Sequence, residues 1–264
     1  MERLIFGTGP VRLGADGVKT RSGLGAHLTK VLGLPVRVVA AASYADLLGQ
    51  LSRGEVHLAW MSPALALNAC DELEAMPLVS AVRSPGAQFY GTLYVRADSN
   101  MKTPEDLRGK KIAWVDTDSC SGYLFPRIAL AAEGIDVPSF FGEEKLLGSH
   151  DAVGRAVAQR AADVGATYMN VDDDAFTGST ILAGWCDVTT DPMRTILRTD
   201  PIPSDMVIAS RELDAGWREK ALRALTSLHE DPDVVRLVKH LFGAIRFEPA
   251  QLARYDIVRR AMRT

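Results

Sequence analysis

Two short polar segments of this chain combine residue types that can hold an oxyanion. The first, Asp116–Gly122, reads DTDSCSG; it follows the apolar run Ile112–Val115 and precedes apolar residues at helical spacing. The first backbone N–H groups of a helix have no partner within it, and the helix dipole adds partial positive charge, so an anion can bind there without Lys or Arg. Ser119 and Ser121 would add hydroxyl donors where a phosphate or phosphonate oxygen would lie.

The second segment repeats this arrangement. Gly148–Ala152 reads GSHDA, follows a short strand-like run at 145–147 and precedes a helical pattern from Val153. Turns after neighbouring parallel strands lie at one edge of the sheet, so we expect the two loops to face one crevice. The competing interpretation is that Asp118 or Ser119 only caps its helix, as these residue types often do.

Alternating strand and helix patterns predict the scaffold that positions these loops. Near the N-terminus, short apolar runs alternate with segments whose apolar residues have helical spacing. This alternation is typical of an α/β fold with mainly parallel sheets flanked by helices. The predicted strands are 4–7, 36–40 and 57–61, and the predicted helices are 23–32, 45–52, 214–228, 231–242 and 249–262.

The same pass along the chain predicts two lobes. The segment 88–96, rich in aromatic and β-branched residues, is expected to cross to the second lobe, and 194–205 to return as the other hinge strand. Residues 206–209 would then rejoin the first sheet, and the three C-terminal helices would pack on the first lobe. The expected division is 1–90 plus 200–264 for lobe 1 and 91–199 for lobe 2.

The order of these motifs resembles the substrate-binding proteins of phosphonate, phosphite and phosphate ABC importers. The matching segments occur in the same order from about residue 3 to residue 213. So many matches in one order are much less probable by chance than a match to a single motif. It implies a two-lobe, type II periplasmic-binding-protein fold with the ligand cleft between the lobes. The matching segments are 43–48, 54–60, 95–99, 103–111, 116–126, 148–152, 163–166 and 200–205.

The resemblance also implies roles for single residues in the two loops. Ser119, Cys120, Ser121 and Gly122 would wrap the phosphoryl oxygens with side chains and backbone N–H groups, and His150 would donate from the facing loop. Cys120 stands where the family usually has Thr, and a thiol is a weaker donor than a hydroxyl. Affinity for a tetrahedral oxyanion would fall accordingly.

Two further positions would read the rest of the ligand. The resemblance implies that Tyr44 closes one side of the pocket and that Asp205 pairs with the amine of an aminoalkylphosphonate. Ser62 replaces the usual Gly and Ala66 lies near a common aromatic position, so we expect a more open wall on the first lobe. Tyr90 and Tyr94 are predicted to be core residues, although either could face the cleft.

Composition excludes several other classes of function. A net charge of −3 and a pI near 6.0 do not indicate the excess of basic residues that binding to nucleic acid requires. Three widely separated cysteines match neither a disulfide framework nor a metal site, so we expect no cofactor and no metal. The expected partners are a small oxyanion and an ABC permease or membrane sensor, bound by a monomer.

The compartment and the rival function stay open at this point. The family implies the periplasm, but no basic and apolar leader is recognised before Leu4, so the cytoplasm is the alternative. The rival is an enzyme on the same fold, resembling the menaquinone-pathway chorismate dehydratases, with His150, Asp172–Asp174 and Asp205 as its acids and bases. A nucleophilic Cys120 beside His150 is a third reading. The serine-rich segment favours capture without catalysis.

Overall fold

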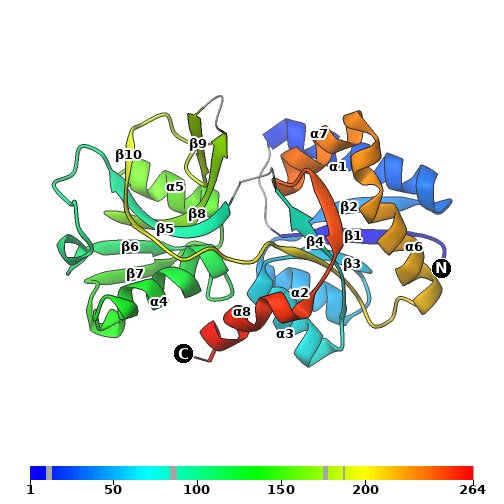
Figure 1. Cartoon of the computed structure of the whole chain (residues 1–264), viewed down its shortest axis with the longest axis horizontal. Helices are drawn as coiled ribbons and strands as arrows, with labels where there is room; N and C mark the ends of the chain where they lie inside the picture. The colour runs from blue at the N-terminus through cyan, green and yellow to red at the C-terminus, as the bar shows by residue number, and fades with distance from the viewer. Residues whose placement is uncertain (10–13, 84–87, 175–177, 187, 264) are drawn as a thin grey trace. The chain divides into compact units, whose positions relative to one another are not determined.

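The computed structural model describes residues 1–9, 14–83, 88–174, 178–186 and 188–263, with the backbone alone at 14–16, 88, 172–174 and 178–182 (Figure 1). The chain forms two compact units. The first comprises 1–84 and 204–256, and the second comprises 85–203 and 257–264. The candidate side chains of Asp172–Asp174 lie outside the described residues. Each unit is built on one sheet.

The first unit holds a six-stranded mixed sheet in the order β12-β4-β11-β3-β1-β2. The strands β3, β1 and β2 are parallel, whereas β11, β4 and β12 join by antiparallel pairing. The bounds are β1 Leu4–Thr8, β2 Val36–Ala40, β3 Leu58–Met61, β4 Met76–Val82, β11 Met206–Ala209 and β12 Arg246–Pro249.

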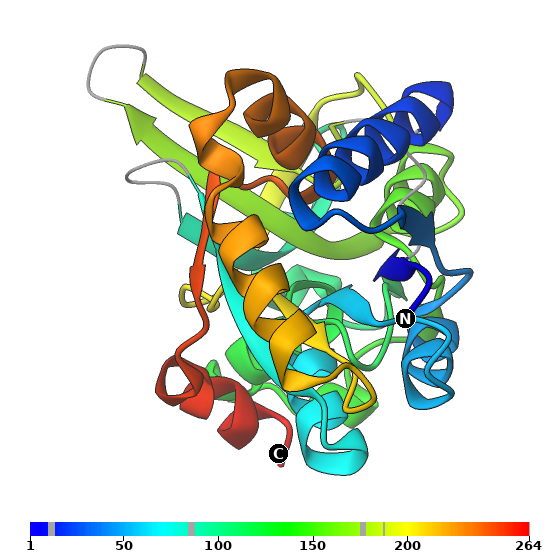
Figure 2. The same cartoon turned by 90° about the vertical axis from the view of Figure 1, so that its right-hand side faces the viewer.

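Helices cover both faces of this first sheet (Figures 1 and 2). Alternate strand residues such as Leu4 and Phe6 are fully buried in a core shared with α1, α6 and α7. On the other face, Gly7 lies against Leu47 of α2, where an added Cβ would be 2.7 Å from its Cδ1. The bounds are α1 Gly14–Leu32, α2 Tyr44–Ser52, α3 Pro63–Leu73, α6 Ala215–Thr226, η4 Leu228–Glu230, α7 Pro232–Phe242 and η5 Leu252–Tyr255. The short α8, Asp256–Ala261, follows and belongs, apart from Asp256, to the second unit.

The second unit holds a mixed sheet in the order β10-β5-β8-β6-β7, with β9 paired to β8. The strands β8, β6 and β7 are parallel, and the other pairs are antiparallel. Its core cluster lies between the sheet and α4, and α5 packs with buried Val153 and Val157. The bounds are β5 Gln88–Arg96, η1 Pro104–Leu107, β6 Lys111–Trp114, η2 Cys120–Leu124, α4 Phe125–Ala132, η3 Val137–Ser139, β7 Glu143–Leu146, α5 His150–Ala158, β8 Val164–Asp174, β9 Gly178–Ala183 and β10 Met193–Arg198.

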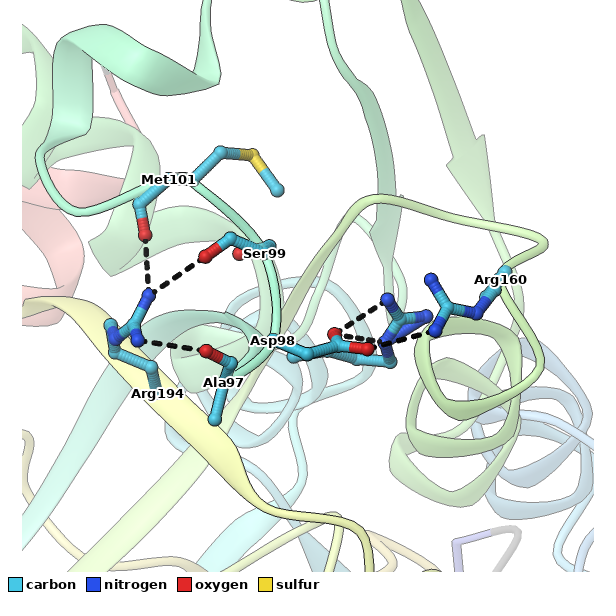
Figure 3. Close-up of polar contacts among 7 residues, drawn as sticks. Ala97, Asp98, Ser99, Met101, Arg160 and Arg194 are labelled. Atoms are coloured by element: carbon cyan, nitrogen blue, oxygen red, sulfur yellow. Dashed lines mark hydrogen bonds and ion pairs between the residues drawn. The ribbon is translucent and has the colours of Figure 1, made fainter.

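A network of arginines fixes the turn that follows β5 (Figure 3). The Arg194 guanidinium donates to the carbonyl oxygens of Ala97, Ser99 and Met101 at 2.8, 3.1 and 3.0 Å. Asp98 accepts from Arg96 and from Arg160 on the turn after α5, at 2.6 and 2.8 Å. Because β5 runs antiparallel to β8, this turn lies at the edge of the sheet opposite the loops that follow β6 and β7.

Two expectations about the scaffold need correction. The sheets are mixed rather than mainly parallel, because β4, β11 and β12 of the first unit and β5, β9 and β10 of the second pair antiparallel. The helix expected over 249–262 is wrong at its start: 246–249 is a strand whose Phe247 is buried and whose backbone pairs with β4. A short 3-10 turn and the six-residue α8 follow it.

Two aromatic side chains pack against other rings in the interior of the units. Tyr94 is fully buried, with its ring 4.3 Å from that of Trp185, and Trp60 packs on Phe242 at 4.7 Å. The cysteines at 70, 120 and 186 are thiols and not disulfides. Among the described residues, no helix combines the length and the apolar character that crossing a membrane requires.

Candidate anion-binding site

The loop after β6 ends in a wide helical turn. Ser119 is its N-cap, and its Oγ accepts from the Gly122 N–H at 3.1 Å. The Leu124 N–H donates to the Ser119 carbonyl at 3.0 Å, five residues back, so 120–124 forms a π-helical turn before α4. Such a turn begins with N–H groups that precede its first internal bond, here those of Cys120 and Ser121. The capping interpretation therefore holds for Ser119 but not for Asp118.

Close packing holds this turn in place. A Cβ on Gly122 would lie 2.4 Å from Cγ2 of Val115, and the Val115 N–H donates to the Gly122 carbonyl at 3.1 Å. On the other side, the Ser121 carbonyl lies against Gly91 of β5, 2.9 Å from where a Cβ would stand. Any larger residue at either glycine would displace the backbone. The chain therefore needs glycine at both positions to form this turn.

The three residues before Gly122 are almost fully enclosed. Ser119, Cys120 and Ser121 are 2%, 1% and 3% exposed. Donors that water does not screen interact more strongly with an anion than donors at the surface do. The turn therefore has the low-dielectric surroundings that strengthen hydrogen bonds from its first N–H groups to an oxyanion.

The histidine loop lies directly beside the serine loop. The Leu147 and Gly148 N–H groups donate to the carbonyls of Trp114 and Val115 at 3.0 and 2.7 Å, which extends the β6–β7 pairing past the ends of both strands. Ser149 then caps α5 by accepting from the Ala152 N–H at 3.2 Å. The expectation that the two loops meet at one sheet edge is confirmed within the second unit.

His150 begins α5 and is held by groups on β8. Its Nδ1 lies 2.8 Å from the Thr167 hydroxyl, and its ring meets that of Tyr168 edge to face at 5.0 Å. Burial lowers the pKa of His150 to about 4, because the protonated ring would lose its hydration. His150 is therefore a neutral hydrogen-bonding group at physiological pH, which suits a donor role and does not supply a cation.

Tyr44 is in the first unit, at the start of α2. Ser43 caps this helix by accepting from the Asp46 N–H at 3.0 Å, which places Tyr44 at the first helical position. Its ring lies against Gly9 after β1, with Cε1 3.0 Å from where a Cβ on that glycine would stand. An aromatic ring thus lies at the carboxyl end of β1, and its role as a pocket wall stays an expectation from the resemblance.

Asp205 immediately precedes β11 and forms an ion pair that the sequence did not predict. Arg83 donates to its Oδ2 at 3.0 Å and to the Ser204 hydroxyl at 2.8 Å. The side chains of Arg83 and Asp205 are 8% and 17% exposed. Burial raises the pKa of Asp205, whereas the Arg83 guanidinium opposes this rise. Arg83 is 122 residues away in sequence, and no spacing rule links the two.

The pairing with Arg83 changes the interpretation of Asp205. A carboxylate with a buried guanidinium partner has a structural role besides any contact with a ligand amine. The neighbouring Ser204 carbonyl accepts from the Tyr255 hydroxyl at 2.7 Å, so this segment is anchored from two sides. Among the described residues, no cluster of three or more His, Cys, Asp or Glu is placed to hold a metal ion.

Comparison with known proteins identifies the family. Residues 6–255 match the profile of the family described as ABC transporter, phosphonate, periplasmic substrate-binding protein. A 159-residue stretch is 30% identical to the phosphate-import protein PhnD of Mycolicibacterium smegmatis, covering 55% of this chain and 49% of that protein. The chain thus aligns with about half the length of this curated relative.

Solved structures share the fold. PhnD1 from Prochlorococcus marinus in complex with methylphosphonate gives a TM-score of 0.81 at 17% identity, covering 99% of this chain and 97% of that one. A binding protein component of an ABC phosphonate transporter from Pseudomonas aeruginosa gives 0.82 at 18% identity, covering 99% and 86%. At such identities the likeness shows the two-lobe α/β fold. With the profile match over most of its length, the chain belongs to the phosphonate family of ABC transporter periplasmic substrate-binding proteins.

Proposed function

We propose that this protein captures a phosphonate, phosphite or phosphate-like anion and delivers it to an ABC permease or a membrane sensor, without chemical turnover. The observation that carries the proposal is the pair of adjoining loops in the second unit. The N–H groups that open the π turn, the Ser121 hydroxyl and the His150 ring all belong to segments joined by the Leu147 and Gly148 hydrogen bonds. These groups are donors, as a phosphoryl group requires.

The donor set is sufficient for tight binding. A micromolar dissociation constant corresponds to about 8 kcal/mol. Hydrogen bonds to a charged group contribute about 1.5 to 3 kcal/mol each, so four or five well-aimed donors reach this range without a metal ion. The Ser119 and Ser121 hydroxyls, the N–H groups that open the turn at Cys120 and Ser121, and the His150 ring would supply that number, whereas the Gly122 N–H is bonded to Ser119 Oγ and shapes the turn.

Tyr44 and Asp205 complete the proposed recognition set. Tyr44 contributes an aromatic surface, and Asp205 contributes a carboxylate that would favour ligands with an amine. The curated relative is named a phosphate-import protein, and one structural neighbour was solved with methylphosphonate. Both names support an oxyanion with a tetrahedral phosphorus centre. Family membership likewise supports action in the periplasm and a permease partner.

Calorimetry of single-serine variants tests the anion site. Ser121→Ala should weaken methylphosphonate binding about tenfold, because it removes one donor to a charged group. Ser139→Ala is the matched control, since among the described residues the hydroxyl of that exposed serine bonds to Asp136, three positions away in the same unit. Equal affinities for wild type and Ser121→Ala would remove the serine turn from the ligand site.

The same titrations separate capture from catalysis. Wild-type protein is incubated with chorismate and with methylphosphonate, and the recovered small molecules are identified by mass spectrometry. Unchanged methylphosphonate with one-to-one binding is the expected result. Consumption of chorismate would instead establish an enzyme on this fold.

A further inference from the structure

We propose that Thr167 is a positioning residue that orients the imidazole of His150 and fixes its proton on Nε2, the donor toward the bound anion. The ligand part of this inference rests on the proposed function. The contact that motivates it is the 2.8 Å distance between the Thr167 hydroxyl and Nδ1 of His150. Thr167 lies on β8 and was not among the residues that the sequence singled out.

The direction of this hydrogen bond follows from the surroundings of Thr167. Its side chain is fully buried, and among the described residues its hydrogen-bond partner is Nδ1 of His150. If the Thr167 hydroxyl did not donate to this acceptor, its buried O–H would be left without a hydrogen bond, at a desolvation cost of about 1–3 kcal/mol. The hydroxyl therefore donates and Nδ1 accepts. A neutral imidazole that accepts at Nδ1 carries its proton on Nε2.

Packing restricts the rotation of both side chains. A Cβ on Gly184 would lie 2.1 Å from Oγ1 of Thr167 and 3.2 Å from Cβ of His150, so this glycine backbone closes directly over the pair. The Tyr168 ring meets the imidazole edge to face, and the Gly184 N–H donates to the Tyr168 carbonyl at 3.2 Å. The imidazole is thereby held between β8 and the turn after β9.

The chemistry explains why the proton position matters. An anion accepts hydrogen bonds, so a ring nitrogen that presents a lone pair toward it would repel it, whereas an N–H attracts it. Because burial lowers the pKa of His150, the ring cannot become a donor on both sides by protonation near neutral pH. The tautomer set by Thr167 then decides whether His150 assists binding. Hydrogen bonds behind a histidine set its tautomer in the same way at metal sites.

The sheet offers a matched control for the loss of a buried threonine hydroxyl. Thr92 of β5 is the register partner of Thr167 and is equally buried. Its hydroxyl donates to the Leu197 carbonyl at 2.8 Å and not to His150. Thr92→Val and Thr167→Val each delete one buried hydroxyl on neighbouring strands, but only the second removes the partner of His150.

The test combines histidine NMR with calorimetry on the full chain. Long-range ¹H–¹⁵N spectra of ligand-free protein labelled in histidine report the tautomer of His150, whose signal is identified by its loss in His150→Gln. Wild type, Thr167→Ser and Thr92→Val should show the Nε2–H form, and Thr167→Val a mixture of tautomers. Methylphosphonate affinity should fall about tenfold in Thr167→Val and stay within about threefold of wild type in the other two.

Three results would overturn the inference. These are an Nδ1–H form in the wild type, an unchanged tautomer and affinity in Thr167→Val, or an equal loss of affinity in Thr92→Val. Absence of binding of methylphosphonate, phosphite and phosphate by the wild type would refute the proposed function and the ligand part of the inference. The ligand-free spectra would still decide separately whether Thr167 sets the tautomer.

Discussion

Substitution of Gly122 by alanine is the perturbation that most directly tests how the serine turn is built. The added Cβ would lie 2.4 Å from Cγ2 and 2.7 Å from Cβ of Val115, and 3.0 Å from Oγ of Ser119. Val115 is fully buried at the end of β6, and its backbone forms hydrogen bonds with Gly122 and Gly148 of the two loops. It therefore cannot move aside to make room for the added Cβ. The turn itself must move instead.

The required displacement can be estimated from these distances. Carbon atoms pack at about 3.5 Å, so the 2.4 Å approach must lengthen by roughly 1 Å. A shift of that size breaks the 3.1 Å bond from the Gly122 N–H to Ser119 and misdirects the N–H groups of Cys120 and Ser121. Loss of two charge-assisted bonds corresponds to about 3–6 kcal/mol, or at least a hundredfold in affinity. Overpacking should also cost about 1–3 kcal/mol of stability.

Calorimetry with methylphosphonate and urea unfolding measure the two effects. Gly216→Ala on α6 is the control, because within the described part of the chain its Cβ would meet only Asp214, at 3.3 Å, and alanine favours a helix over glycine. A folded Gly122→Ala protein with wild-type affinity would refute the reasoning, since it would show that the turn geometry does not determine binding.

The remaining predictions concern buried polar groups. Tyr94→Phe should leave stability in urea unfolding unchanged or raise it by about 1 kcal/mol, because within the described residues the buried Tyr94 hydroxyl has no hydrogen-bond partner. Tyr255→Phe should destabilise the protein, because it removes the hydrogen bond to the Ser204 carbonyl. Asp205→Asn should lower the free energy of unfolding by about 3 kcal/mol, because Arg83 loses its carboxylate partner, and an unchanged unfolding midpoint would contradict this. The same variant should weaken the binding of 2-aminoethylphosphonate more than that of methylphosphonate. Burial lowers the pKa of His150 from 6.5 to about 4, so the neutral ring contributes stability that is complete above pH 6.5 and is lost as the pH falls toward 4. The difference in unfolding free energy between wild type and His150→Gln should therefore fall by up to about 3 kcal/mol over this range. A difference that does not change with pH would refute the prediction.

The sequence predicted well those features that depend on local pattern. The strands 36–40, 88–96 and 206–209 have the predicted bounds, because apolar and β-branched runs bounded by polar residues indicate strands directly. The two loops were also placed correctly, since parallel pairing of β6 and β7 brings their carboxyl ends together. Family resemblance predicted the two-lobe class.

Features that depend on distant contacts were missed. The partner of Asp205 is Arg83, and the partner of His150 is Thr167, and both contacts form only when separate elements pack. The π turn depends on the fit of Gly122 against Val115, which no propensity describes. Strand β12 was not predicted, and the helix expected from Pro249 starts too early because a proline is typical of the first helical position; in the structure Pro249 ends a strand paired with β4.

The central claim is that this protein binds a phosphorus oxyanion without converting it. The most direct measurement is calorimetric titration of protein freed of bound ligand by unfolding and refolding, against phosphate, phosphite, methylphosphonate, 2-aminoethylphosphonate and chorismate. The account predicts one-to-one binding of at least one phosphorus oxyanion at micromolar affinity or better, with the ligand recovered intact. No heat from any phosphorus oxyanion, or turnover of chorismate, would contradict it.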